Sequence, residues 1–131
     1  MKWLAILFSL FIVWVIISAD ESTLPHAIHA LYNFPNGDKV GHFILYGLLN
    51  LIWTLTLLPR PRPNAKRIIL LSGLVLAALV GLEEWSQSLF ASRTMDIFDL
   101  LASYSGLTVA ALIVYRMRNA RPSPEINRDE Q

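Results

Sequence analysis

The chain contains no cysteine and few charged residues. Without cysteine, disulfides and thiolate metal sites are excluded. Only 16% of the 131 residues are charged, too few to coat a soluble globule of this size, whereas 54% are hydrophobic. The formal net charge of +1 lacks the basic excess of nucleic-acid-binding proteins, so no nucleic-acid partner is expected. The composition therefore argues against an ordinary soluble domain, and the length allows one domain at most.

The apolar residues lie in four long blocks, at positions 3–19, 40–58, 68–82 and 97–115. Each block approaches the roughly 20 residues that cross the hydrocarbon core of a bilayer. The sequence therefore predicts an all-α, polytopic membrane protein in which four transmembrane helices form a small bundle. A cleaved signal peptide is the alternative for the first block, since Lys2 and Ala19 suit its two ends. Ile17 fits the small-residue rule for the cleavage site poorly.

The basic residues indicate the orientation of these spans. Nine of the eleven Lys and Arg residues precede the first block, separate the second from the third, or follow the fourth. Lys39 and Arg93 lie on the opposite side. The positive-inside rule then predicts that both termini are cytoplasmic. Seven of the ten acidic residues lie on the outer side, and acids contribute little to orientation, so their placement needs another cause.

The remaining segments differ in character. Residues 59–65 contain three prolines and predict a short, stiff connection. Residues 20–37 hold too many apolar residues for a hydrated loop, and an interfacial helix in this first outer loop is one interpretation. Residues 1–118 are predicted to form the transmembrane domain. Residues 119–131 are polar, contain two prolines and are predicted to be a disordered cytoplasmic tail.

Polar residues of the last three blocks fall at one depth. A helix rises 1.5 Å per residue, so roughly twenty residues reach from the cytoplasmic end of a block to the outer boundary. This count places His42, Glu84 and Asp99 each about 5 Å below that boundary. Residues three or four apart also share one helix face. The resulting stripes are Asp38, His42, Tyr46 and Asn50; Gly73, Ala77, Gly81, Glu84 and either Gln87 or Ser88; and Asp96, Asp99, Ser103, Gly106 and Ala110.

These stripes predict close helix packing in the inner half and an outward-facing polar pocket in the outer half. An unpaired charge at the bilayer centre costs on the order of 3 kcal/mol on insertion scales. Glu84 and Asp99 are therefore expected to face inward and to pair with a cation. Acids and bases in one pocket suit general acid–base chemistry or cation binding. Taken singly, Asn50, Ser103 and Tyr46 fit a purely structural role.

The candidate site residues fall into three groups. The candidate catalytic residues are His42, Glu84 and Asp99. The candidate binding residues are Asp38, Lys39, Tyr46, Gln87, Arg93 and Asp96. The candidate ligands of a divalent cation are Asp96 and Asp99, and no other cofactor is expected.

Two segments carry a family resemblance. DKVGHFILYGLL, from Asp38 to Leu49, resembles the DK-x-x-HF-x-x-Y element of the VanZ-like membrane proteins. EWSQSLFASRTMDIFDLLASYSG, from Glu84 to Gly106, resembles their second element, E-x-x-Q followed by R, D, D and N-x-x-G. Ser103 stands where the family usually has Asn. The resemblance implies a multi-pass protein of the bacterial cytoplasmic (inner) membrane, linked to glycopeptide resistance of the teicoplanin type, and implies no defined biochemical activity.

Three functions compete. In the first, the outer site binds a membrane lipid headgroup or a lipid-linked envelope precursor, with Lys39 and Arg93 on phosphate and the carboxylates on sugar or amine groups. In the second, a hydrolase or transferase acts on an envelope lipid, with His42 or Glu84 as general base and a cation on the two aspartates. The third, a small transporter or channel, is disfavoured because the polar stripes fade toward the cytoplasm. The oligomeric state stays open.

Overall fold

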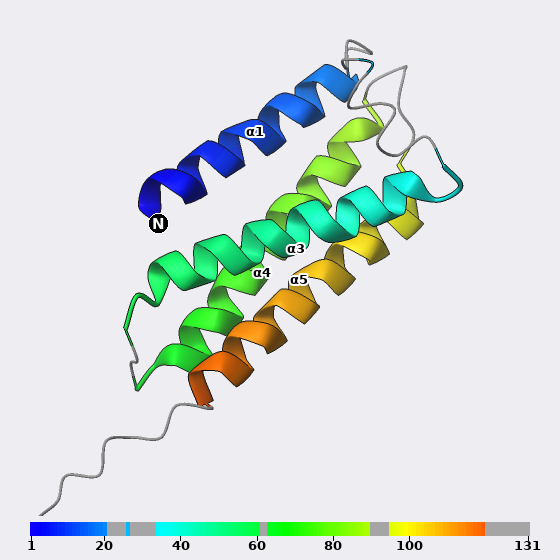
Figure 1. Ribbon diagram of the computed structural model, residues 1–131. Helices are drawn as coiled ribbons and strands as arrows, with labels where there is room; N and C mark the ends of the chain where they lie inside the picture. Colours follow the sequence, from blue (N-terminus) through cyan, green and yellow to red (C-terminus); the bar gives the residue numbers. More distant parts are fainter. Residues whose placement is uncertain (21–25, 27–33, 61–62, 90–94, 120–131) are drawn as a thin grey trace, which may run out of the picture.

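The computed structural model describes residues 1–20, 26, 34–60, 63–89 and 95–119. Their long elements are α1 (Lys2–Asp20), α3 (Gly37–Leu57), α4 (Ala65–Gln87) and α5 (Ile97–Asn119) (Figure 1). The helices run in alternating directions, so α1 and α4 begin at the end of the molecule where α3 and α5 finish (Figure 1). We call this the basic end and the opposite one the acidic end. The prediction of an all-helical fold is confirmed.

Three of the helices, α3, α4 and α5, are long and apolar enough to cross a membrane. Their outer surfaces carry large exposed apolar side chains such as Leu70, Leu74 and Leu112. Surfaces of this kind suit lipid rather than water. The apolar part of α1, Lys2–Ser18, is shorter. Three of the four predicted spans are therefore long and apolar enough to cross a membrane, and α1 is a shorter apolar helix lying alongside α3.

The most extensive helix contact joins α3 and α5, and two glycines allow it. A Cβ atom added to Gly47 would lie 3.2 Å from the carbonyl oxygen of Gly106. A Cβ atom added to Gly106 would overlap the carbonyl oxygen of Phe43. The two backbones therefore touch directly, which requires residues without side chains. This contact holds the first turns of α3 beside the first turns of α5.

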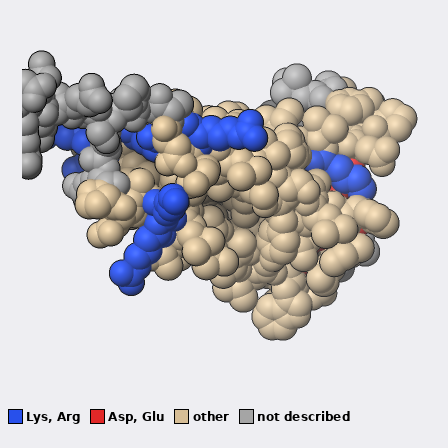
Figure 2. Space-filling view, turned by 90° about the horizontal axis from the view of Figure 1, so that it is seen from below, with Lys and Arg blue, Asp and Glu red and all other residues tan. Residues whose placement is uncertain are grey.

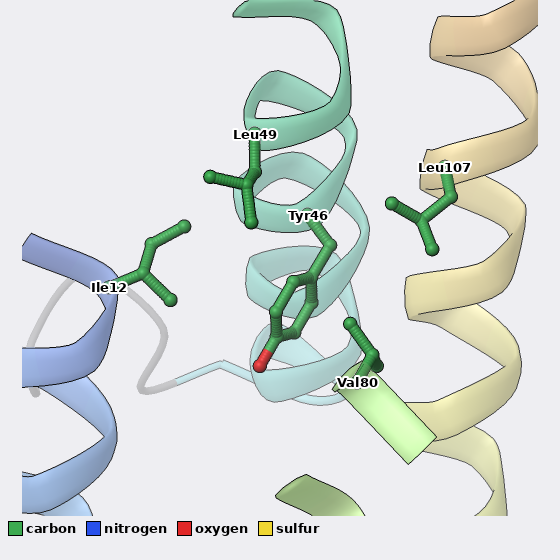
Figure 3. Close-up of a cluster of buried hydrophobic side chains, with 5 residues drawn as sticks. All are labelled: Ile12, Tyr46, Leu49, Val80 and Leu107. Carbon is green, nitrogen blue, oxygen red and sulfur yellow. The ribbon is translucent and has the colours of Figure 1, made fainter. Parts of the chain in front are cut away.

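Two apolar clusters form the core. The first joins residues of all four helices, Ile12, Tyr46, Leu49, Val80 and Leu107 (Figure 3). The second lies toward the basic end and contains Leu58, Ile69 and Val114. A hydrogen bond of 2.9 Å from Trp53 Nε1 to Ser9 Oγ adds a polar tie between α3 and α1.

A buried polar chain also links the helices. Asn50 Nδ2 donates to the Leu107 carbonyl at 2.8 Å, and Thr54 Oγ1 donates to Asn50 Oδ1 at 3.0 Å. Thr54 also shares a hydrogen bond of 2.9 Å with Ser72. Polar groups at this depth need internal partners because lipid supplies none. Asn50 therefore has the structural role that its position alone suggested.

Charged residues gather at the two ends. Figure 2 shows Lys and Arg concentrated toward one end, uncharged surface in the middle, and the visible acidic side chains beside a basic one at the other end. At the basic end, the Arg118 guanidinium donates to the Leu58 carbonyl and so satisfies the end of α3. The Lys66 ammonium lies 5.6 Å from the centre of the Tyr115 ring, a cation–π contact.

Two predictions fall largely outside the described residues. The interfacial helix expected in 20–37 depends on residues 21–25 and 27–33, and the tail expected at 119–131 consists almost wholly of residues 120–131. Both stay predictions.

Candidate functional site

Lys39, in the first turn of α3, lies among three aspartates from two helices. Its Nζ atom is 3.0 Å from Asp38 Oδ2, 3.0 Å from Asp96 Oδ2 and 3.1 Å from Asp99 Oδ1. The side chain of Asp99 is 13% exposed and that of Asp38 is 52% exposed. The pair with Asp99 is therefore the one that water screens least. The expectation that Asp99 pairs with a cation is met by Lys39.

Local structure explains how α3 presents this lysine. Asn36 adopts a left-handed conformation with φ of 62°, which asparagine tolerates better than most residues, and the chain then enters α3 at Gly37. Asp38 consequently falls in the first turn, where the helix dipole favours a carboxylate. Lys39 follows it and extends toward the start of α5.

Asp96 combines a helix cap with an ion pair. Its Oδ1 atom accepts the Phe98 N–H at 2.8 Å, the usual contact of a capping aspartate at the start of a helix, while Oδ2 pairs with Lys39. The Phe98 N–H and, after it, the Lys39 ammonium lower the pKa of the Asp96 carboxyl below its ordinary 3.8. A lowered folded-state pKa stabilises the protein fully above the unfolded pKa, and this stabilisation is lost as pH falls through the folded value. The ion pair is therefore intact at neutral pH.

Glu84 ties α4 to the start of α5. The residue is 1% exposed, and its Oε1 atom accepts the backbone N–H of Asp96 at 2.7 Å. The amide of Gln87 lies 3.5 Å from Oε2, at the outer limit for a hydrogen bond. Among the described residues no ion pair to Glu84 is found, in contrast to the prediction of a cationic partner. Arg93, one of the predicted partners, lies outside the described residues.

His42 contacts a hydroxyl from α5. Its Nδ1 atom is 3.2 Å from Ser103 Oγ, and that hydroxyl donates to the Asp99 carbonyl at 2.9 Å. Because the Ser103 hydroxyl gives its single proton to the Asp99 carbonyl, Nδ1 of His42 is the donor toward Ser103. Ser103 is fully buried and orients the imidazole. The serine that departs from the VanZ-like pattern thus holds a candidate site residue.

Glu83 is a member of the site that the sequence analysis missed. Its Oε2 atom accepts the Tyr46 hydroxyl at 2.9 Å, and its Oε1 atom accepts the Gln87 amide at 2.7 Å. Tyr46 and Gln87 therefore meet at Glu83. The available signal was the spacing of four between Glu83 and Gln87, which places both on one helix face.

These contacts connect α3, α4 and α5 in one layer at the acidic end. We define the acidic cluster as Asp38, Lys39, Glu83, Glu84, Asp96 and Asp99. His42, Tyr46 and Gln87 border it, so every predicted site residue except Arg93 lies in or beside this layer.

An apolar cavity lies beside this layer, and it is not the polar pocket predicted around His42, Glu84 and Asp99. This cavity of about 930 Å³ lies between α1, α3 and α4, and it reaches the layer only at Tyr46 and Glu83. His42, Glu84 and Asp99 do not line it. His42 contacts Ser103, Glu84 accepts from the Asp96 backbone, and Asp99 pairs with Lys39. Of the acidic side chains in the layer, only that of Glu83 borders the cavity.

Three carboxylates of the acidic cluster could hold a cation. One oxygen each from Asp38, Asp96 and Asp99 lies within 4.8 Å of the others. Carboxylate oxygens are the ligands that Mg²⁺ and Ca²⁺ prefer. Asp38 thus joins the two predicted ligands. The Lys39 ammonium already contacts all three, so a divalent ion would have to displace it.

Comparison with known proteins gives one informative relative. Over 115 residues the chain is 35% identical to a protein of the fission yeast Schizosaccharomyces pombe that is described as uncharacterized. The match covers 84% of this chain and 64% of the relative, so the chain spans less than two thirds of that protein's length. No family model matches the chain, and no solved structure matches it. Similarity thus extends to a eukaryote, while no activity follows from it.

Proposed function

We propose that the chain is a polytopic membrane protein whose acidic cluster binds the amine of a membrane lipid headgroup. The observation that carries the proposal is the charge imbalance of the cluster. Three carboxylates, those of Asp38, Asp96 and Asp99, surround the ammonium of Lys39, and Glu83 and Glu84 add two carboxyl groups to the same layer. The three aspartates alone exceed the lysine by two negative charges, and the charge of Arg93 would still leave one. Carboxylates near a membrane boundary require cationic partners, and a headgroup amine supplies one.

An amine fits this cluster better than a phosphate does. Lys39 is the only basic residue with a described contact to the cluster, and its ammonium is bound by three carboxylates. A phosphate would have to separate these pairs and would then face the remaining carboxylates, which repel it. An ammonium group, by contrast, would be attracted by the same carboxylates. This departs from the sequence-based hypothesis in which Lys39 holds phosphate.

The alternatives have less support. A hydrolase that used His42 to activate the Ser103 hydroxyl would need that hydroxyl to be accessible, and Ser103 is fully buried and donates to a carbonyl. A transporter requires a polar path toward the basic end. Asn50 and Thr54 are fully buried there and bond to neighbouring helices.

The four apolar blocks and the distribution of basic residues support four spans with both termini cytoplasmic, and the family resemblance leads us to include membership of the VanZ-like proteins in the proposal. A link to teicoplanin resistance and to a bacterial inner membrane would follow in a bacterial host. Because a similar protein occurs in fission yeast, we favour a ligand that bacterial and eukaryotic membranes share. An amine-bearing phospholipid meets this condition, whereas a precursor of the bacterial envelope does not.

Reporter fusions test the orientation. Fusions at residues 30 and 124 are expected to report the outer side and the cytoplasm respectively, because nine of the eleven basic residues then lie inside. Paired alkaline phosphatase and green fluorescent protein fusions at each position make the measurement. The reverse pattern would remove the basis for placing the acidic cluster on the outer side.

Removal of charge tests amine binding. In nanodiscs made from equal parts phosphatidylethanolamine and phosphatidylglycerol, the protein is expected to retain the first lipid preferentially after detergent extraction. Glu84→Gln and Asp99→Asn each keep side-chain shape and remove one carboxylate. We expect each to reduce the preference by up to about tenfold, which corresponds to one charged hydrogen bond of about 1.4 kcal/mol.

Lipid mass spectrometry measures the ratio of the two retained lipids. Glu125→Gln, in the segment 119–131, removes the same charge outside the cluster and serves as the matched control. An unchanged preference in both cluster variants, at normal membrane abundance, would return these carboxylates to a structural role.

A further inference from the structure

The cavity beside the acidic cluster is an apolar groove inside the membrane-spanning part of the protein. Its walls come from α1, α3 and α4, and its lining includes Val13, Ile16, Val75 and Leu79. The three hydroxyls in the lining are already engaged: Ser9 accepts from Trp53, Ser72 shares a bond with Thr54, and Tyr46 donates to Glu83. The groove therefore offers hydrocarbon contact along most of its length.

One charged side chain, that of Glu83, lies at the acidic end of this groove. Both of its carboxylate oxygens accept neutral donors, the Tyr46 hydroxyl and the Gln87 amide. Among the residues that the structure describes, no ion pair satisfies its charge. A carboxylate at this depth gains from a cationic partner, and the groove is the side from which one can approach.

The length and the apolar lining of the groove suit a hydrocarbon chain. From Ile68 to Glu83, α4 contributes a wall about 22 Å long at 1.5 Å per residue. A hydrocarbon chain is much thinner than a helix, and the wall is longer than the roughly 15 Å of one leaflet's hydrocarbon.

We propose that this groove holds an acyl chain of a phospholipid with a primary amine headgroup, and that Glu83 binds the ammonium. The inference rests on the proposed function and deepens it, because it names the lipid class and the path of its chain. Glu83 then acts as the junction between groove and acidic cluster. Glu83 and Glu84 are adjacent on α4. Glu83 borders the groove, and Glu84 contacts the start of α5.

Filling the groove tests the chain-binding half. Val75→Trp places a bulky ring in the groove from an exposed position on α4. Val109→Trp is the matched control, since Val109 is exposed on α5 and does not line the groove. In nanodiscs of equal parts phosphatidylethanolamine and phosphatidylglycerol, native mass spectrometry counts the lipids that survive release from the disc. We expect Val75→Trp to reduce retained lipid at least about fivefold and Val109→Trp to leave it unchanged.

Glu83→Gln tests the headgroup half. It is expected to keep the retained amount and to remove the preference for phosphatidylethanolamine. If Val75→Trp and Val109→Trp retain equal amounts of lipid, and both proteins elute normally and have normal helicity, the groove is not the site of the acyl chain. In that case the proposed function would still stand if Glu84→Gln and Asp99→Asn lowered the preference. No preference in the wild type would overturn the amine proposal, whatever the groove holds.

Discussion

Gly106→Ala is expected to lower the free energy of unfolding by about 3 kcal/mol, the upper range for overpacking. The added Cβ atom would overlap the carbonyl oxygen of Phe43, which belongs to a helix backbone and cannot rotate away. Relief requires α3 and α5 to separate, and their contact is the most extensive in the fold. The better helix propensity of alanine returns up to about 1 kcal/mol in soluble helices and does not offset the loss.

Gly41→Ala provides the matched control on α3. A Cβ atom at Gly41 would have nothing within 4 Å, so no destabilisation is expected. Reversible unfolding in mixed detergent micelles, followed by circular dichroism, compares both variants with the wild type. Equal stability of Gly106→Ala and Gly41→Ala would show that α3 and α5 do not make this close approach.

Lys39→Met is expected to destabilise the protein at neutral pH, and by more than removal of an isolated surface lysine does. The variant keeps the length of the side chain and leaves three carboxylates without their shared ammonium. Removal of one partner leaves the carboxylates uncompensated, and the exposure of Asp38 lets water offset part of the loss. The penalty should shrink as the pH falls through the lowered pKa of Asp96, because a protonated carboxyl neither pairs with Lys39 in the wild type nor repels its neighbours in the variant.

Lys66→Met is the control for loss of a lysine. Lys66 is exposed and makes a cation–π contact with Tyr115, so its removal should cost less than about 1 kcal/mol. Unfolding of both variants at neutral and acidic pH makes the measurement. A pH-independent loss in Lys39→Met would contradict the assignment of its effect to the three carboxylates.

The same variant separates amine recognition from phosphate recognition. If the acidic cluster binds an amine, removal of Lys39 increases the negative excess and the preference for phosphatidylethanolamine should persist or rise. If Lys39 instead holds phosphate, total lipid retention should fall. The nanodisc measurement described above distinguishes these two results.

The sequence by itself determined the class of the protein and the depth of its polar residues. Apolar blocks of nearly spanning length predict helices because a bilayer leaves no other way to satisfy the backbone of a single short chain. The constant rise of a helix then places Asp99 and Glu84 at matching depths. It also predicts the face on which Gly106 and Ser103 lie, because side chains repeat every three or four residues.

Which atoms meet was decided by the tertiary structure. The sequence places several acidic residues at the same depth as Lys39 and does not say which of them it contacts. The close approach of α3 to α5 at Gly47 and Gly106 makes Asp96 and Asp99 its partners. Glu83 and Glu84 are adjacent and chemically identical, so no local pattern assigns one to the groove and the other to the start of α5. That difference arises from the rotation of α4 against its neighbours, which depends on side-chain packing over its whole length. The groove has the same origin, because α1 lies alongside α3 and leaves space between itself and α4.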